Sequence, residues 1–143
     1  MKVSELARAA EVTAETVRHY TREGLLAPER DPDNGYHIYS ARDLERLDFI
    51  QRARHLGFSL GEIGEILDHA DHGDSPCPMV RDLLAARLPQ IRQRIRELEE
   101  LASRMEQAME SWQEMPDGVP DGHSLCRLIE SVPTNVAHAE EDA

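Results

Sequence analysis

The sequence predicts a mainly α-helical protein: a winged helix-turn-helix domain, then a long helix suited to an antiparallel coiled coil, then a short C-terminal loop and helix. Three observations support this fold class. Apolar residues recur at helical spacing in short N-terminal segments, an Asn-Gly pair separates two short extended segments, and a heptad pattern runs through the second half. Aromatic residues make up only 4% of the 143 residues, which favours helices packed through aliphatic side chains over a β-sandwich.

Two short helices are expected at the N-terminus. Residues 3–10 form the first, with Ser4 as its predicted N-cap, and Thr13 is the predicted N-cap of the second. Two short helices joined by about three residues make a helix-turn-helix, whose second helix enters the major groove of DNA. The polar side chains that this second helix can extend outward are Thr16, Arg18, His19 and Tyr20.

A hairpin is expected after the second helix. Asn34-Gly35 is the strongest short-range signal for a tight hairpin turn, because both residue types tolerate positive φ. Residues 36–39, Tyr-His-Ile-Tyr, alternate as a returning strand should. We therefore predict a two-stranded wing beside the helix-turn-helix.

Two further helices complete the predicted domain, residues 1–70. Ser40 opens the first of them and Gly57 ends it, and Ser59 opens the next through a Ser-x-x-Glu capping box. The polar segment 71–77 is rich in turn formers and is the predicted linker to the rest of the chain.

A heptad seam predicts a long helix over residues 78–114. The seam residues, alternately four and three positions apart, are Leu84, Leu88, Ile91, Ile95, Leu98, Ala102, Met105, Met109 and Trp112. Such a seam is typical of a coiled coil, and extending its register back by one heptad reaches Cys77. Pro89 lacks the backbone N–H that a helix uses, so it either kinks this helix or marks its start.

The C-terminal part divides into two predicted segments. Residues 115–132 begin with two Pro-Asp-Gly turns and continue into a short helix. Residues 133–143 are acidic and weakly apolar, which is typical of a disordered tail. The net charge of −12 is uneven: residues 1–58 carry nine basic and ten acidic residues, so the arginines available for phosphate contacts concentrate there.

Composition excludes several classes of function. No apolar run is long enough to cross a membrane and the first residues lack the apolar core of a signal peptide, so we expect a soluble, cytoplasmic protein with no membrane partner. In a reducing compartment, Cys77 and Cys126 are better explained as ligands or redox groups than as a disulfide. We do not expect an enzyme, because no third group orients His123 and Cys126 and no glycine-rich substrate loop is present.

Four motifs stand in series in the N-terminal part. They are Val3-Ser4-Glu5-Leu6-Ala7, Thr16-Val17-Arg18-His19-Tyr20, Glu23-Gly24-Leu25-Leu26 and Asn34-Gly35-Tyr36-His37-Ile38-Tyr39. Together they resemble the MerR family of transcriptional regulators. The resemblance implies a homodimer on double-stranded promoter DNA whose spacer between the RNA polymerase recognition elements is overlong. Ligand binding would then make the dimer bend and undertwist that spacer, which activates the promoter for RNA polymerase.

The resemblance also implies which side chains contact DNA. The matching positions are Arg18 and Tyr20 on the second helix, Tyr36 and His37 in the wing, and Arg54 on the helix after the wing. Thr16, His19 and Tyr39, which belong to the same helix and wing, complete the candidate set. His37 stands where family members often carry Arg, which predicts a weaker or pH-sensitive wing contact.

Metal-responsive members of the family place a Cys at the start of the dimer helix and Cys or His residues in the C-terminal loop of the other protomer. Cys77 matches the first position and Cys126 matches the last loop cysteine. The first loop cysteine is missing, since residues 116–118 are Pro-Asp-Gly. This departure excludes the two-cysteine loop of the copper(I) sensors and leaves a mercury-type three-thiolate site one ligand short. His123 is the best replacement.

The resulting set, Cys77, His123 and Cys126, suits a divalent metal ion, zinc before cadmium, lead or cobalt. A further ligand would come from a carboxylate or an imidazole. The candidates for it are Asp117, Asp121, His69 and His72. Two alternatives remain open: the same fold sensing oxidants or electrophiles through Cys77 and Cys126, and an interaction module whose long helix recruits another protein.

Overall fold

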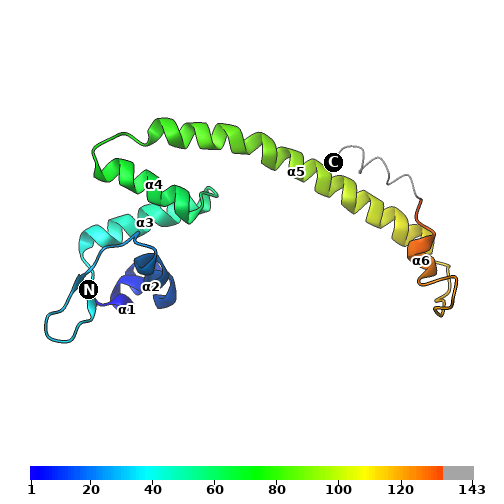
Figure 1. Cartoon of the computed structure of the whole chain (residues 1–143), viewed down its shortest axis with the longest axis horizontal. Coiled ribbons are helices and arrows are strands. Elements are labelled where there is room, and N and C mark those ends of the chain that lie inside the picture. Colours follow the sequence, from blue (N-terminus) through cyan, green and yellow to red (C-terminus); the bar gives the residue numbers. More distant parts are fainter. Residues whose placement is uncertain (134–143) are drawn as a thin grey trace. The chain divides into compact units, whose positions relative to one another are not determined.

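The computed structural model describes residues 1–133, and Figure 1 shows them as helices joined by short connections and one small hairpin. In chain order the elements are α1 (Val3–Ala10), α2 (Ala14–Arg22), β1 (Glu29–Arg30), β2 (His37–Ile38), α3 (Ala41–His55), α4 (Leu60–Asp71), α5 (Cys77–Trp112) and α6 (Arg127–Glu130). The prediction of a mainly α-helical fold is confirmed. Apart from its first residue, the predicted tail 133–143 lies outside the described residues.

The chain forms two compact units. The first, Met1–Leu84, holds α1 to α4, the hairpin and the first turns of α5, and the second, from Ala85 onward, holds the rest of α5 and α6. Within residues 1–133, no helix is both long enough and apolar enough to cross a lipid bilayer.

The two N-terminal helices form where the sequence predicts them, with one correction at the first cap. The N-cap of α1 is Lys2, whose backbone N–H donates to Glu5 Oε1 at 3.0 Å. Ser4 therefore lies inside α1, because Glu5 in the first turn reaches back to the chain before it. Thr13 caps α2 as predicted: its Oγ1 accepts from the backbone N–H of Thr16 at 3.1 Å.

The predicted wing is present, but its turn is wider than a two-residue turn. β1 and β2 pair antiparallel, with Glu29 opposite Ile38 and Arg30 opposite His37. The connection spans residues 31–36, and its backbone is closed by a bond from Gly35 N–H to Asp31 O at 2.8 Å. Gly35 has a φ of 74°, whereas Asn34 has no positive φ and instead accepts from Tyr36 N–H through its own side chain. This local side-chain bond competes with the tight turn.

α3 and α4 start with the same capping arrangement. Ser40 N–H donates to Asp43 Oδ2 at 2.9 Å while Asp43 N–H donates to Ser40 Oγ at 3.3 Å, and Ser59 repeats the pattern at α4. Gly57, with a φ of 89°, turns the chain between the two helices, and this left-handed conformation strongly favours glycine. The sequence predicted the capping box at Ser59, and the structure shows a second one at Ser40; these boxes set the two helix starts.

The core of the first unit is mostly aliphatic, with two aromatic rings, and draws on every helix of that unit. Its buried hydrophobic residues are Leu6, Ala7, Val17, Leu25, Leu26, Tyr39, Leu47, Ile50, Ala53, Phe58, Ile63, Ile66 and Leu67. Residues from the first two turns of α5, among them Met79 and Leu83, pack against this core at partial burial. The start of α5 is therefore fixed to the helix-turn-helix unit, and Cys77 is the first residue of that helix.

α5 is one helix from Cys77 to Trp112 with Pro89 inside it, so Pro89 does not start the helix. No residue of α5 is buried within the chain. The seam residues of its middle turns are each about half exposed: Leu88 52%, Ile91 51%, Ile95 49% and Leu98 51%. A row of half-exposed aliphatic side chains along one helix is an apolar face without a partner in the single chain.

Candidate functional site

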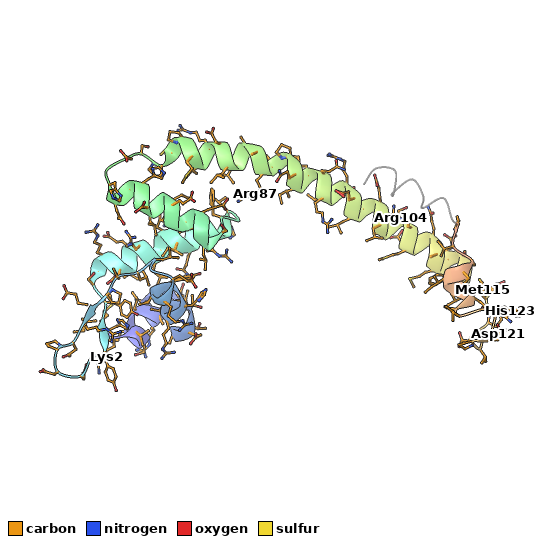
Figure 2. The ribbon with its side chains drawn as sticks, viewed as in Figure 1. Lys2, Arg87, Arg104, Met115, Asp121 and His123 are labelled. Carbon is orange, nitrogen blue, oxygen red and sulfur yellow. The ribbon has the colours of Figure 1, made fainter. Side chains whose placement is uncertain are left out.

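A concave surface of about 620 Å³ lies between α1, α2 and the wing. Its lining residues are Lys2, Val3, Ser4, Arg18, Thr21, Arg22, Gly35, Tyr36, His37 and Tyr39. Three of them are basic and none is a carboxylate, so the lining of this surface carries positive charge. Figure 2 shows Lys2 beside the wing, where it precedes α1. We call this surface the basic groove.

The arginines of α2 are held by one carboxylate next to the basic groove. Glu15 Oε1 accepts from Arg22 Nη2 at 2.8 Å, and its other oxygen lies 3.7 Å from Arg18 Nη1. The hydrogen bond and charge of Arg22, with a smaller contribution from Arg18, hold the pKa of Glu15 below its usual range. Arg18 and Arg22 are 53% and 59% exposed, so both guanidinium groups are accessible to a phosphate.

The wing places two candidate residues at the same groove. Tyr36 is 70% exposed at the hairpin connection, as expected for a side chain that reaches an external partner. His37 is half buried, and its Nδ1 is inaccessible to solvent and has no hydrogen-bond partner within the described residues. A buried imidazole nitrogen without a partner is a destabilising feature that a bound ligand can relieve.

Tyr39 requires a correction. Its side chain is only 2% exposed, and its hydroxyl lies 2.8 Å from Thr21 Oγ1 on α2. A ring buried in the core cannot present a face to DNA, so Tyr39 is removed from the set of candidate contacts. It fixes the wing to α2 instead. The alternating pattern of residues 36–39 puts Tyr39 and His37 on the same face of the strand. It does not predict that this face packs on the core.

The remaining candidates on α2 and α3 lie near the protein surface. Thr16 is half buried, and its Oγ1 lies 2.8 Å from Thr13 Oγ1. His19 and Tyr20 are half buried with ring centroids 5.9 Å apart, and Tyr20 also packs against the core. Arg54 is exposed and donates through Nη1 to Phe58 O at 3.1 Å, a bond that orients its side chain.

Sequence reasoning missed two of the three lysine and arginine residues that line the groove, Lys2 and Arg22. A signal for Arg22 was present: it stands four residues after Arg18, which puts both arginines on the same face of a helix. Lys2 carries no such signal. Its place follows from the position of α1 against the wing, where the amino group of Met1 donates to Tyr39 O at 2.6 Å.

The thiol of Cys77 is exposed at the N-terminus of α5. The backbone N–H of Cys77 donates to Ser75 Oγ at 3.3 Å, so the residues just before the helix cap it. His69 and His72 lie at the end of α4, and the ring of His72 is bonded to its own helix through Asp68 O at 2.8 Å. One imidazole nitrogen of His72 is thus already engaged.

The segment between α5 and α6 is shaped by two carboxylates. Asp121 Oδ1 accepts from the backbone N–H groups of His123 and Ser124, and Glu130 accepts from Ser124 Oγ at 2.6 Å and from Leu125 N–H at 3.0 Å. These bonds hold the pKa of Glu130 below its usual range, chiefly through the Ser124 hydroxyl. Figure 2 shows Asp121 and His123 together in this segment. We call residues 115–126 the C-terminal loop.

The C-terminal loop exposes the other predicted metal ligands. Cys126 is the N-cap of α6 with its thiol exposed, and His123 is exposed three residues earlier. Trp112, at the end of α5, ties the loop region to the helix by donating from Nε1 to Ser131 Oγ at 3.2 Å. Asp121 uses Oδ1 to shape the loop, and its second oxygen makes no hydrogen bond to any of the described residues.

The predicted ligands do not form a metal site within one chain. Across residues 1–133, no three His, Cys, Asp or Glu side chains lie close enough together to hold an ion. The donor set itself is chemically suitable, because two thiolates and an imidazole fit a borderline ion such as Zn²⁺. Both thiols are exposed, so each is free to accept a ligand from outside its own chain.

The ring of His72 provides a pH-dependent prediction. The backbone carbonyl of Asp68, and then its carboxylate 3.6 Å away, raise the pKa of His72 above its usual value. Protonated His72 therefore stabilises the end of α4 at low pH, and this contribution is lost as pH rises through the raised pKa. In an Asp68→Asn variant the midpoint of the His72 titration, followed by NMR, is expected to fall but to stay above the usual value. An unchanged midpoint would contradict the role of the carboxylate.

Two family models match the chain: "MerR HTH family regulatory protein" over residues 1–70 and "MerR, DNA binding" over residues 44–108. The HTH-type transcriptional regulator ZntR of Escherichia coli (strain K12) is 31% identical over 132 residues, which cover 92% of this chain and 91% of ZntR. The HTH-type transcriptional regulator HmrR of Rhizobium leguminosarum bv. viciae is 38% identical over 106 residues, 74% of this chain and 81% of HmrR.

A solved structure extends the similarity to the whole fold. The transcription regulator PbrR691 from Ralstonia metallidurans CH34, in complex with lead(II), matches with a TM-score of 0.72 at 28% sequence identity. The match covers 93% of this chain and 99% of that one. It therefore includes the helix-turn-helix unit, the long helix and most of the C-terminal part.

Proposed function

The chain belongs to the MerR family of helix-turn-helix regulators, and on that premise we propose that it is a metal-responsive activator that acts as a homodimer on promoter DNA. Its relatives are transcriptional regulators rather than enzymes. The observation that carries the proposal is the exposure of one thiol at the first residue of α5 and of another after its end, on a helix whose apolar seam is half exposed. Pairing two such helices covers the seam and brings thiols of different chains together.

The basic groove supports the DNA-binding part of the proposal. Its lining combines arginines of α2 with the wing and contains no carboxylate. In a helix-turn-helix protein the second helix reads the major groove while flanking basic residues contact phosphates. Arg18, Arg22 and Lys2 supply the phosphate contacts in this proposal, and the exposed Tyr36 reaches the backbone from the wing.

The seam of α5 supports the homodimer. Antiparallel pairing of two copies lays Leu88, Ile91, Ile95 and Leu98 against the apolar seam of the partner helix, which removes four half-exposed aliphatic side chains per chain from water. A two-fold dimer places two reading helices on the two halves of a palindromic operator. RNA polymerase is engaged through the promoter that this dimer distorts.

The proposed metal site is shared between protomers. Cys77 of one protomer would bind the ion together with His123 and Cys126 of the partner subunit. This donor set favours Zn²⁺, with Cd²⁺, Pb²⁺ and Co²⁺ as competitors, because soft thiolates are combined with one imidazole. The ligands must be deprotonated, so metal affinity falls as pH falls.

Binding of the ion between protomers would select one geometry of the dimer. Bending or untwisting a promoter requires on the order of 1–6 kcal/mol, which a ligand can supply only if it prefers one of two dimer geometries. The start of α5 packs on the core of the DNA-reading unit through Met79 and Leu83. Movement of Cys77 toward a shared ion therefore changes the position of that whole unit.

A second candidate function is thiol-based sensing of oxidants or electrophiles. It is favoured by the exposure of both thiols, since an accessible thiol can be oxidised or alkylated. Operator activation by a peroxide or an aldehyde in metal-free buffer would support this alternative over the metal site.

In vitro transcription with a panel of metals tests the proposal. The template carries the operator selected by the wild-type protein from a random duplex pool. We expect Zn²⁺, Cd²⁺ or Pb²⁺ to raise transcription and the apo protein to leave it low. Activation by copper(I) alone would contradict the mixed thiolate and imidazole site.

Replacing Arg18 tests the basic groove. The change Arg18→Ala is expected to weaken operator binding by roughly tenfold or more, since it removes a phosphate or base contact of about 1–3 kcal/mol. Arg18 is 53% exposed, so the variant should keep its fold. Fluorescence anisotropy of a labelled operator duplex measures the affinity. Arg52→Ala is the matched control, because Arg52 is 79% exposed, pairs with Asp48 on α3 and does not line the groove.

A further inference from the structure

We propose that Glu15 limits the electrostatic part of DNA binding, by holding Arg18 and Arg22 so that each phosphate contact must first displace a carboxylate. This inference rests on the proposed DNA binding by the basic groove. It assigns a role to a residue that does not line the groove and that lies on the helix expected to read DNA. Glu15 is therefore a positioning residue for the two arginines, and no direct DNA contact is assigned to it.

The geometry of the carboxylate carries the proposal. Each oxygen of Glu15 faces a different arginine: Oε1 lies 2.8 Å from Arg22 Nη2 and Oε2 lies 3.7 Å from Arg18 Nη1. Both arginines line the basic groove, while Glu15 does not. The two arginines thus line the groove while their guanidinium groups pair with the carboxylate. A phosphate that enters the groove competes with Glu15 for the same donors.

The strength of these pairs allows the exchange. Glu15 is 67% exposed and both arginines are more than half exposed, so solvent screens the ion pairs and they break readily. Arginine forks match phosphate as well as they match carboxylate. The pairs therefore do not prevent DNA binding, but they reduce the net gain from each phosphate contact.

The reduction acts on every DNA that the groove binds. Binding to non-operator DNA is almost entirely electrostatic, so its affinity depends mainly on such phosphate contacts. Binding to the operator also includes base contacts and shape recognition, which Glu15 does not affect. Glu15 consequently lowers both affinities by a similar factor and changes how steeply each of them depends on salt.

Salt dependence gives the same proposal a second readout. DNA binding releases counterions, with a slope of about −0.9 in log K against log[salt] for each phosphate neutralised. When the arginines move to phosphates, Glu15 is left with an uncompensated charge and takes up a cation. The wild-type slope is then smaller in magnitude than that of a protein without this carboxylate.

The variant Glu15→Gln tests this inference, with Glu15→Ala as a second variant in case the amide forms new bonds. Glu23→Gln is the matched control: it makes the same charge change at the end of α2, where the structure records no ion pair for Glu23 among the described residues. Affinities for the selected operator and for a scrambled duplex are measured between about 50 and 200 mM salt. Thermal melting of each variant confirms the fold.

Both Glu15 variants are expected to bind the operator and the scrambled duplex roughly two- to fivefold more tightly at low salt, with a slope steeper by about 0.9 for each duplex. The ratio of operator to non-operator affinity stays near its wild-type value, and Glu23→Gln keeps the wild-type slope. Equal effects of Glu15→Gln and Glu23→Gln on the slope, or an unchanged slope in both Glu15 variants, would overturn the proposal. Failure of the wild-type protein to select any operator would instead overturn the proposed function itself.

Discussion

A heterodimer of a Cys77→Ser protomer and a Cys126→Ser protomer is expected to bind one metal ion, whereas each homodimeric variant binds none. In the proposed dimer each site takes Cys77 from one chain and Cys126 from the other. The Cys126→Ser protomer still provides Cys77 and the Cys77→Ser protomer still provides Cys126, so one of the two sites is complete. Two affinity tags isolate the heterodimer, and native mass spectrometry counts the ions.

The prediction follows from what the single chain lacks. Within residues 1–133, no cluster of metal-ligand side chains exists, although two exposed thiols and an exposed imidazole are present. Loss of one of three protein ligands in a zinc site removes most of the affinity, which is why each homodimeric variant is expected to be silent. The expected effect on metal-dependent transcription is a loss of the response rather than a shift.

A matched heterodimer provides the control. One wild-type protomer paired with a Cys77→Ser/Cys126→Ser protomer contains the same number of cysteines as the first heterodimer, in a different arrangement. If the site is shared, this heterodimer has no complete site and binds no ion. The reverse pattern, with one ion bound here and none in the first heterodimer, would show that each site lies within one chain.

The second large effect is expected from Leu98→Glu in the middle of the α5 seam. Leu98 is 51% exposed in the single chain, so the substitution should leave the chain folded. In the proposed dimer it places a carboxylate in an apolar interface against its counterpart, where burial of the charge is strongly unfavourable. We expect monomers at micromolar concentration in sedimentation experiments. Operator affinity should fall by roughly 100-fold, because two linked half-site contacts become independent.

Gln107→Glu controls for the added charge. Gln107 is exposed on α5 and lies outside the heptad seam, so the same change in charge occurs away from the proposed interface. This variant should stay dimeric and bind the operator like the wild-type protein. A dimeric Leu98→Glu protein would contradict the assignment of the seam as the interface.

Much of the fold could be predicted because local patterns determine it. Thr13, Ser40 and Ser59 were predicted to cap helices, and the structure confirms all three caps. Each side chain accepts a hydrogen bond from the backbone N–H of the residue three positions later. The heptad seam predicted the long helix, and the structure shows that Pro89 lies inside it. A single proline in a long helix removes one bond, which the many remaining bonds of that helix tolerate.

Other features of the fold depended on side-chain bonds and tertiary packing that compete with the local sequence preference. Asn34 closes an Asx turn with its own side chain, so the wing has a wider connection than the Asn-Gly pair predicts. Tyr39 was expected to contact DNA but is buried, because the wing packs on α2 through the bond of its hydroxyl to Thr21. These outcomes depend on tertiary packing rather than on local propensity.

The candidate site was only partly predictable for a similar reason. Arg18, Tyr36 and His37 were identified from motifs, and the structure places all three at the basic groove. Lys2 and Arg22 join them only when α1, α2 and the wing are assembled. The pairing of Cys77 with His123 and Cys126 stays a prediction, since it requires a second chain.

The bond between Trp112 and Ser131 has a practical consequence. Trp112 is the only tryptophan of the chain, and it lies at the junction of α5 and the C-terminal loop, where its indole N–H donates to Ser131 Oγ. Indole emission responds to hydrogen bonding and to solvent, so the protein contains a built-in optical reporter of its loop. Unlabelled protein titrated with metal in a fluorimeter should therefore show a change in emission if metal binding at the loop alters this bond.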